Sequence, residues 1–154
     1  MKIVKGNLLR LAEAGEFDII VQGCNCFCTM NSGLAKQIKD QYPEAYAADL
    51  KTEKGSWNKL GDYSLFRGKR FTIINAYTQF GFNKPGECKD VFDYNAFAII
   101  LEKLERTFGS SSFGFPLIGC GLAGGNKERI LDMLKDFNQK IEADGGSVTI
   151  VEYA

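Results

Sequence analysis

The chain has 154 residues with 19 basic and 19 acidic side chains, so its formal net charge at neutral pH is zero. Nonspecific binding to nucleic acid needs a basic surface, so this balance gives no support to a nucleic-acid partner. The length suits a single domain over residues 1–154 with an ordinary globular core. No signal peptide, membrane-spanning run or lipidation motif is recognisable, and we expect a cytoplasmic monomer with no membrane partner.

Histidine is absent from the chain, which excludes Ser-His-Asp and Cys-His catalysis and the histidine-based zinc sites of deaminases and metalloproteases. Three of the five cysteines alternate along one segment, at Cys24, Cys26 and Cys28. Their spacing differs from that of zinc modules, and no second cysteine pair follows. We therefore interpret them as small side chains beneath a tight loop, with metal binding as the alternative, and we expect no metal and no cofactor.

Hydrophobic periodicity divides the chain into alternating strands and helices. We expect strands at 3–4, 17–22, 62–66, 71–76, 113–115 and 148–151. We expect helices at 7–14, 33–40, 44–51, 93–108 and 127–143, with Asn7 and Asp93 or a neighbour as N-caps. Strands that alternate with helices predict an α/β fold with three layers (α/β/α) around a central mixed sheet. The turn at 67–70 predicts a hairpin between two of the strands.

A glycine-rich loop stands out between Phe115 and Asn126, where four glycines fall within seven residues before a helix begins. Glycine lets a ligand approach the backbone closely, and free N–H groups at a helix start favour an anion. The loop lacks a Walker sequence and a dinucleotide fingerprint. The segment 22–33 also follows an apolar strand and opens a helix. If the two strands are neighbours, both loops line one cleft that suits two adjacent phosphates.

Three separated segments, residues 5–9 (Lys-Gly-Asn-Leu-Leu), 22–35 and 118–125, together resemble a macrodomain. The similarity covers almost the whole chain. The branch that it resembles most is the ADP-ribose 1''-phosphate phosphatase type, which is related to the terminal ADP-ribose protein glycohydrolases. Residues 73–79 are similar to the same branch, as found in phage and bacterial members. The resemblance implies a three-layer macrodomain fold with a cleft for ADP-ribose or its 1''-phosphate, and ADP-ribosylated protein as a further partner.

The resemblance also implies which residues contact the ligand. The loop that ends at Gly33 would surround the distal ribose, beside Asn25, and the glycine loop would donate N–H bonds to the diphosphate. Asn7 stands where many macrodomains place an aspartate at the adenine amino group, and Tyr153 would stack on adenine. The expected ligand-binding residues are Asn7, Asn25, Met30, Gly33, Leu34, Ile118, Gly119, Cys120, Gly121, Leu122, Ala123, Gly124 and Tyr153. The alternatives are a plain N-cap for Asn7 and a loop side chain bonded to its own backbone for Asn25.

The function that the resemblance implies is hydrolysis of ADP-ribose 1''-phosphate to ADP-ribose and phosphate. Asn25 and Thr29 are the catalytic candidates, as groups that position a water. Cys28 is an alternative nucleophile, although no basic residue is near it in the sequence. Asp90 and Asp93 could act as general bases, and the alternative for both is helix capping.

Two other functions remain open. One is a binding module that recognises ADP-ribose without turning it over, which Ala123 and the missing histidine favour. The other is removal of ADP-ribose from protein or a base. Related glycohydrolases use a lysine near the end of the middle strand and an aspartate after Gly-Cys-Gly-Leu, where this chain has Thr78 or Gln79 and Ala123. Lys84 lies close by, but its loop suggests a solvated lysine.

Aromatic residues near the same loops are harder to assign. Tyr77, Phe80 and Phe82 follow the middle strand and could cover a ribose or stack on adenine, or fill core and surface positions instead. Trp57 lies in a polar loop and has no obvious partner in the sequence.

Overall fold

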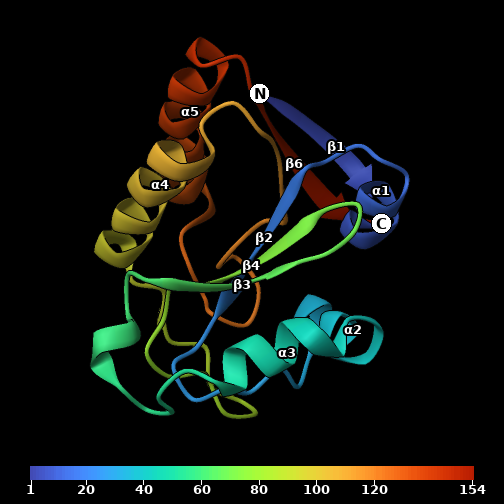
Figure 1. Cartoon of the computed structure of the whole chain (residues 1–154). Coiled ribbons are helices and arrows are strands. Elements are labelled where there is room, and N and C mark those ends of the chain that lie inside the picture. Colours follow the sequence, from blue (N-terminus) through green and yellow to red (C-terminus); the bar gives the residue numbers. More distant parts are fainter.

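The computed structural model describes all residues from 1 to 154, as a six-stranded sheet between two layers of helices (Figure 1). The strands are β1 (Lys2–Gly6), β2 (Ile19–Cys24), β3 (Tyr63–Arg67), β4 (Thr72–Tyr77), β5 (Ser112–Phe115) and β6 (Ser147–Tyr153). The helices are α1 (Leu8–Glu13), α2 (Gly33–Gln41), α3 (Pro43–Leu50), the short 3₁₀ helix η1 (Trp57–Lys59), α4 (Tyr94–Phe108) and α5 (Lys127–Ala143). The expected three-layer α/β/α fold with a mixed sheet is confirmed.

The strand order is β1-β6-β5-β2-β4-β3, and only the β3–β4 pair is antiparallel. Strand β2 therefore lies between β5 and β4, with Ile20 opposite Gly114 on one side and Ile73 on the other. Because β2 and β5 are parallel neighbours, the loops that follow them leave the same edge of the sheet side by side. The adjacency on which the shared cleft depends is thus present.

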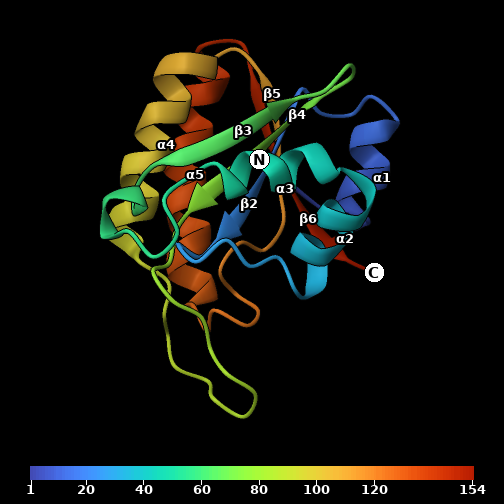
Figure 2. The ribbon, with the colours of Figure 1, turned by 60° about the horizontal axis from the view of Figure 1, so that its bottom comes forward.

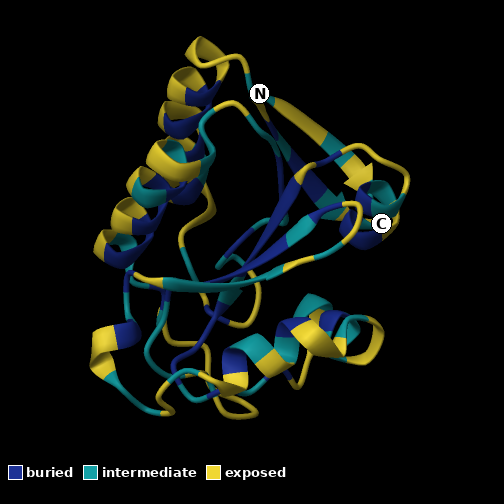
Figure 3. Cartoon of the chain, in the orientation of Figure 1, coloured by how far each residue is buried: buried dark blue, intermediate teal, exposed yellow.

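The central strands of the sheet are mostly buried (Figure 3), and their side chains pack into one core on each face. In β2, Ile19 and Val21 face the core formed with α4 and α5, and Ile20 faces the core formed with α1, α2 and α3. A fully buried side chain of this size contributes about 1.5–3 kcal/mol to folding. The two cores fix the strands between the helix layers, and so they fix the positions of the loops at the strand ends.

The ends of the strands are set by hydrogen bonds between residues that are far apart in the sequence. Strand β2 continues to Cys24, two residues further than predicted, because it pairs with β4 as far as Tyr77. Strand β6 continues to Tyr153 because it pairs with β1 up to Gly6. The predicted N-caps are confirmed, since Asn7 accepts from the N–H of Arg10 and Asp93 begins α4 in the same way.

The loops after β2, β4 and β5 emerge together at one end of the sheet (Figure 2). The two longest reach from 78 to 93 and from 116 to 126 and are joined by one backbone hydrogen bond, from the Val91 N–H to the Ala123 carbonyl. No helix combines the length and the apolar character that crossing a membrane requires.

Candidate functional site

A cleft of about 750 Å³ runs along the carboxyl ends of the strands. Its walls come from the start of α1, the first turn of α2, the glycine loop and the end of β6. The lining residues are Gly6, Asn7, Leu8, Gly33, Leu34, Gln37, Pro116, Leu117, Cys120, Gly121, Lys127, Val151, Glu152 and Tyr153. Both predicted loops thus contribute to one hollow, and six of the predicted ligand-binding residues line it: Asn7, Gly33, Leu34, Cys120, Gly121 and Tyr153.

The glycine loop has a shape that other residues cannot adopt. Gly119 has a φ of +74°, and a Cβ there would overlap the ring of Phe92. Gly124 has a φ of +68°, and a Cβ there would lie 2.6 Å from the carbonyl oxygen of Lys89. Positive φ and close approach both select glycine. These two glycines therefore hold the loop against the segment 89–92, while Gly121 leaves open space where a side chain would stand.

Several amides of this loop have no acceptor within the protein. The N–H groups of Gly119, Gly121, Leu122 and Ala123 donate to no protein atom, whereas those of Gly124 and Gly125 close the turn onto Gly121 and Gly119. Successive free amides in a loop form a concave partial positive charge, which suits an anion. The loop therefore offers the donors that a phosphate group requires.

The opposite wall is the start of α2, which lacks a side-chain cap. Ser32 occupies the N-cap position without bonding the helix, although α1, α4 and α5 are each capped by an Asn or Asp side chain. The first N–H groups of a helix need partners and favour negative charge. Gly33 and Gln37, one turn apart, both line the cleft. The cleft thus has free amide donors on two sides.

The loop after β4 supports the glycine loop from behind. The Asn83 side-chain amide donates to the carbonyl oxygens of Leu122 at 2.7 Å and Lys89 at 2.8 Å. The Val91 N–H donates to the carbonyl of Ala123 at 2.9 Å. Because Asn83 lies 39 residues from Leu122, the shape of the glycine loop depends on a segment that is distant in the sequence.

The other end of the cleft carries the side chains expected near an adenine. Tyr153 is 79% exposed and lines the cleft beside Asn7. The Asn7 side-chain oxygen accepts from the N–H of Arg10 at 3.2 Å, so its role as a helix cap is confirmed and its contact with a ligand stays a prediction. Lys127 and Glu152 also line this cleft and form an ion pair of 3.5 Å. Lys127 thus brings one basic group to the wall of the cleft.

The two predicted catalytic residues, Asn25 and Thr29, are hydrogen-bonded to each other. The Asn25 amide donates to the Thr29 hydroxyl at 2.7 Å, and the Asn25 oxygen accepts from the N–H of Phe27 at 2.9 Å. The alternative of a loop side chain that bonds its own backbone is thus confirmed for the oxygen. The Thr29 hydroxyl still has its own proton to donate, because it accepts the bond from Asn25. The roles of both residues in catalysis stay predictions.

Other predicted residues turn their side chains into the protein. Met30 is fully buried in a small core with Cys24, Cys26 and Tyr77, and Ile118 and Ala123 are buried in the core next to α4 and α5. Only the main chains of Met30, Ile118 and Ala123 can therefore face a ligand, and contact of these three residues with a ligand stays a prediction. Leu122 is 71% exposed and is free to contact one. The interpretation of Cys24 and Cys26 as side chains beneath a tight loop is confirmed.

Tyr77 was a candidate for ribose contact, and the structure shows that this is wrong. Its ring is buried, and its hydroxyl donates to the Asp49 carboxylate at 2.7 Å. The position where related glycohydrolases use a lysine is also closed: Thr78 is fully buried beneath the sheet end, and Gln79 bonds the carbonyl of Gly81. Lys84 is exposed, as expected of a solvated loop lysine.

Cys28 has a basic neighbour that the sequence does not reveal. The ammonium group of Lys59 donates to the Cys26 carbonyl at 3.1 Å and to the Cys28 sulfur at 3.5 Å, and it lies 4.6 Å from the centre of the Tyr77 ring. Burial raises the pKa of the neighbouring Asp49 carboxyl, although the Tyr77 hydroxyl and Lys59 oppose the rise. Lys59 thus ties η1 to the loop after β2.

The remaining thiol at the cleft is not activated. Burial raises the pKa of Cys120, and only the distant charge of Lys127 acts in the other direction. A thiol with a raised pKa stays protonated at neutral pH and is a poor nucleophile. Cys120 therefore lines the cleft without acting as a nucleophile.

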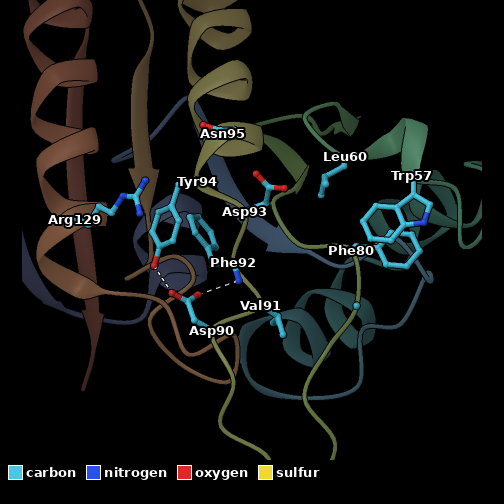
Figure 4. Close-up of a pocket in the computed structure, with 11 residues that line it drawn as sticks. Trp57, Leu60, Phe80, Asp90, Val91, Phe92, Asp93, Tyr94, Asn95 and Arg129 are labelled. Carbon is cyan, nitrogen blue, oxygen red and sulfur yellow. Dashed lines mark hydrogen bonds between the residues drawn. The ribbon is translucent and has the colours of Figure 1, made fainter.

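Asp90 and Asp93 lie outside the cleft. Asp93 caps α4 through the N–H of Ala96 at 2.9 Å, and Asp90 accepts from the Tyr94 hydroxyl at 2.6 Å. Both line a second hollow of about 480 Å³, together with Trp57 and Phe80 (Figure 4). The capping alternative is thus confirmed for Asp93, and neither carboxylate faces the cleft as a base.

The sequence prediction did not include several residues that line the cleft or support its loops. Gln37 and Lys127 could have been found, because each follows a predicted loop on the face of the helix that opens there. Asn83 and Lys59 carry no local signal, since their partners are far along the chain.

Comparison with known proteins agrees with this geometry. No protein-family model matches the chain. A 17.5 kDa protein of Enterobacteria phage T4, from the tk-vs intergenic region and itself uncharacterised, is 36% identical over 152 residues and covers 92% of each chain. Among solved structures, the macrodomain of Thermus aquaticus DarG has a TM-score of 0.72 at 20% identity, with 99% of this chain and 97% of that chain covered.

A second solved structure, Thermosipho africanus DarTG in complex with ADP-ribose, has a TM-score of 0.75 at 16% identity. The match covers 97% of this chain and 40% of that longer one. The chain therefore belongs to the same family as the phage T4 protein, and it has the macrodomain fold. The resemblance inferred from residues 5–9, 22–35 and 118–125 is confirmed.

Proposed function

We propose that the cleft binds ADP-ribose, with the diphosphate between the glycine loop and the start of α2. The free N–H groups of Gly119, Gly121, Leu122 and Ala123 carry this proposal, because they are donors without acceptors beside an uncapped helix. Asn7 and Tyr153 at one end suit an adenine, and Asn25 at the other end would lie near the distal ribose. The macrodomain-containing DarTG of Thermosipho africanus holds ADP-ribose, which supports the same class of ligand here.

We further propose that the protein hydrolyses ADP-ribose 1''-phosphate. In this step a water oxygen forms a bond to phosphorus, the bond from phosphorus to the 1'' oxygen breaks, and that oxygen leaves protonated on ADP-ribose while phosphate is released. The Thr29 hydroxyl would donate to the water or to a phosphate oxygen. Asn25 would act through Thr29, because its amide donates to that hydroxyl at 2.7 Å. Loop amides would stabilise the charge that develops on the transferred group.

One observation favours the second candidate, a binding module without turnover. Glu152 is the only carboxylate among the residues that line the cleft, and it is paired with Lys127 at the adenine end. No general base therefore stands near the expected position of the 1'' phosphate. Removal of ADP-ribose from protein or a base has less support, because Thr78 is buried and Ala123 replaces the aspartate of related enzymes.

The test is a pair of measurements on the same protein. Calorimetry with ADP-ribose measures binding, and incubation with ADP-ribose 1''-phosphate measures the release of free phosphate. Binding with release supports the phosphatase, and the release should vanish in a Gly121→Glu variant that still folds. Binding without release supports the module. Absence of binding to either compound would contradict the proposal for the cleft as a whole.

A further inference from the structure

The second hollow lies between η1 on one side and the starts of α4 and α5 on the other (Figure 4). Its volume of about 480 Å³ exceeds what one side chain fills, and it is separate from the cleft because the two share no lining residue. We refer to it as the aromatic hollow, and its walls are Trp57, Leu60, Phe80, Asp93, Tyr94 and Arg129 together with the adjoining backbone. The function proposed for the cleft makes no use of it.

One wall is an aromatic pair that is open to solvent. The Trp57 indole stacks on Phe80, with ring centres 3.3 Å apart and planes only 2° from parallel. Phe80 covers one face of the indole, yet Trp57 remains 65% exposed. Phe80 is in turn held by the edge of the Phe27 ring at 5.0 Å. A rigid, exposed indole face is a surface on which a planar group or a cation can stack.

The other wall carries two carboxylates that form no ion pair. Neither Asp90 nor Asp93 takes part in an ion pair. Asp93 is half-buried, and one of its oxygens is occupied by the N–H of Ala96. Figure 4 shows its carboxylate directed into the space between Tyr94 and Leu60. The hollow therefore combines an indole face with a carboxylate that has bonding capacity left.

The same hollow already holds one guanidinium group of the protein itself. The Arg129 guanidinium lies over the Tyr94 ring, 3.9 Å from its centre, and the Tyr94 hydroxyl bonds Asp90 at 2.6 Å. Ring, guanidinium and carboxylate thus meet at the end near α5. The end near η1 has the ring of Trp57 and the carboxylate of Asp93 without a guanidinium.

We propose that this empty half binds the guanidinium group of an arginine side chain presented by a partner polypeptide. The planar guanidinium would stack on the indole of Trp57 and donate to the free oxygen of Asp93, as planar cations do on aromatic rings and carboxylates. A nucleobase could also stack on the indole, but its phosphate would meet two carboxylates. The space beyond one side chain leaves room for the backbone on either side of the arginine. The inference is independent of the ligand in the cleft.

Trp57 is the only tryptophan in the chain, so its fluorescence reports directly on the hollow. The experiment titrates the full-length protein with the blocked peptide Ac-Gly-Arg-Gly-NH₂. The matched control replaces arginine by citrulline, which has the same shape without the charge, and uridine monophosphate represents a nucleobase. We expect a saturable change with the arginine peptide and binding about tenfold weaker with the citrulline peptide. Free L-arginine should bind less tightly than the blocked peptide.

Two variants make the test specific to the hollow. Asp93→Asn keeps the helix cap, because Asn caps as well as Asp does, and should weaken the arginine peptide about threefold. Asp132→Asn, on an exposed position of α5, removes the same charge elsewhere and should leave the affinity unchanged. Trp57→Leu should abolish the heat of binding in calorimetry. Equal responses to arginine and citrulline, saturation by uridine monophosphate instead, or no response at all would each overturn the proposal.

Discussion

The cleft and the aromatic hollow are both built from loops at the strand ends, but they present opposite chemistry. The cleft offers main-chain amides from two loops and few charged side chains. The hollow offers an exposed indole, two carboxylates and a guanidinium. A site made of backbone depends on the shape of its loop and on its glycines, whereas a site made of side chains depends on residue identity. The two regions should therefore fail under different substitutions.

The largest effect should come from Gly121→Glu. A side chain at this position meets open space, so the protein should fold, but the new carboxylate would fill the anion site and repel the diphosphate. We expect the affinity for ADP-ribose in calorimetry to fall by more than about 100-fold, which corresponds to roughly 3 kcal/mol.

Gly81→Glu is the matched control for this change. Its Cβ also meets open space, but Gly81 borders the aromatic hollow and not the cleft. ADP-ribose should bind this variant as it binds the wild type. Retained affinity in a folded Gly121→Glu protein would remove the glycine loop from the site.

The next effect separates binding from turnover at the loop after β2. If the phosphatase proposal holds, Asn25→Ala should cost about 1–3 kcal/mol of transition-state stabilisation, since Thr29 loses the amide that orients its hydroxyl. Phosphate release at subsaturating substrate measures this loss. Asn31→Ala, an exposed asparagine of the same loop, should leave turnover unchanged. Equal activity in both variants would exclude Asn25 from the mechanism.

A smaller effect tests whether the loop after β4 supports only the cleft, and not the aromatic hollow. Asn83→Ala removes three hydrogen bonds, one to Leu122 and two with Lys89, so the glycine loop should lose part of its shape. We expect ADP-ribose to bind about three- to tenfold more weakly, while the arginine peptide binds as before. Asn95→Ala, on the wall of the hollow, should leave ADP-ribose binding intact. Loss of both ligands in Asn83→Ala would show that the two regions are one unit.

The smallest effect concerns the buried cluster that joins the two regions. Lys59, two residues after Trp57, reaches Cys26 in the cleft loop, and Asp49 is the acidic group beside it. Burial raises the pKa of Asp49, so the folded state keeps this proton to a higher pH than the unfolded chain. The contribution of Asp49 to wild-type stability should therefore decline as pH rises from about 4 through the folded pKa.

Asp49→Asn cannot ionise and lacks this decline. The stability of this variant, measured by urea unfolding, should therefore increase relative to that of the wild type between about pH 4 and pH 7. Asp132→Asn, on an exposed position of α5, is the control and should show no such trend. A difference for Asp49→Asn that stays constant across this range would contradict the effect of burial.

Most of the fold could be predicted because its signals are local. Asn7 and Asp93 as caps, the glycines after β5 and the apolar runs of β2 and β4 specify the elements and their order. The shared cleft could be predicted because the strands before the two loops were expected to be neighbours, and because three segments resemble a macrodomain.

The rest depends on contacts across the chain that periodicity does not encode. Trp57 was without a partner in the sequence, yet it stacks on Phe80, because η1 and the loop after β4 meet only in the folded sheet. Lys59 lies 31 residues from Cys28, and Asn83 lies 39 residues from Leu122. The side chain of Met30 is buried with Cys24, Cys26 and Tyr77, because the loop after β2 turns it under the sheet end.

The most direct test is a crystal of the protein soaked in ADP-ribose. The account predicts the diphosphate within hydrogen-bonding distance of the amides of Gly121, Leu122 and Ala123, with adenine beside Tyr153 and the distal ribose beside Asn25. A nucleotide bound against Trp57 in the aromatic hollow, with the glycine loop unoccupied, would contradict it.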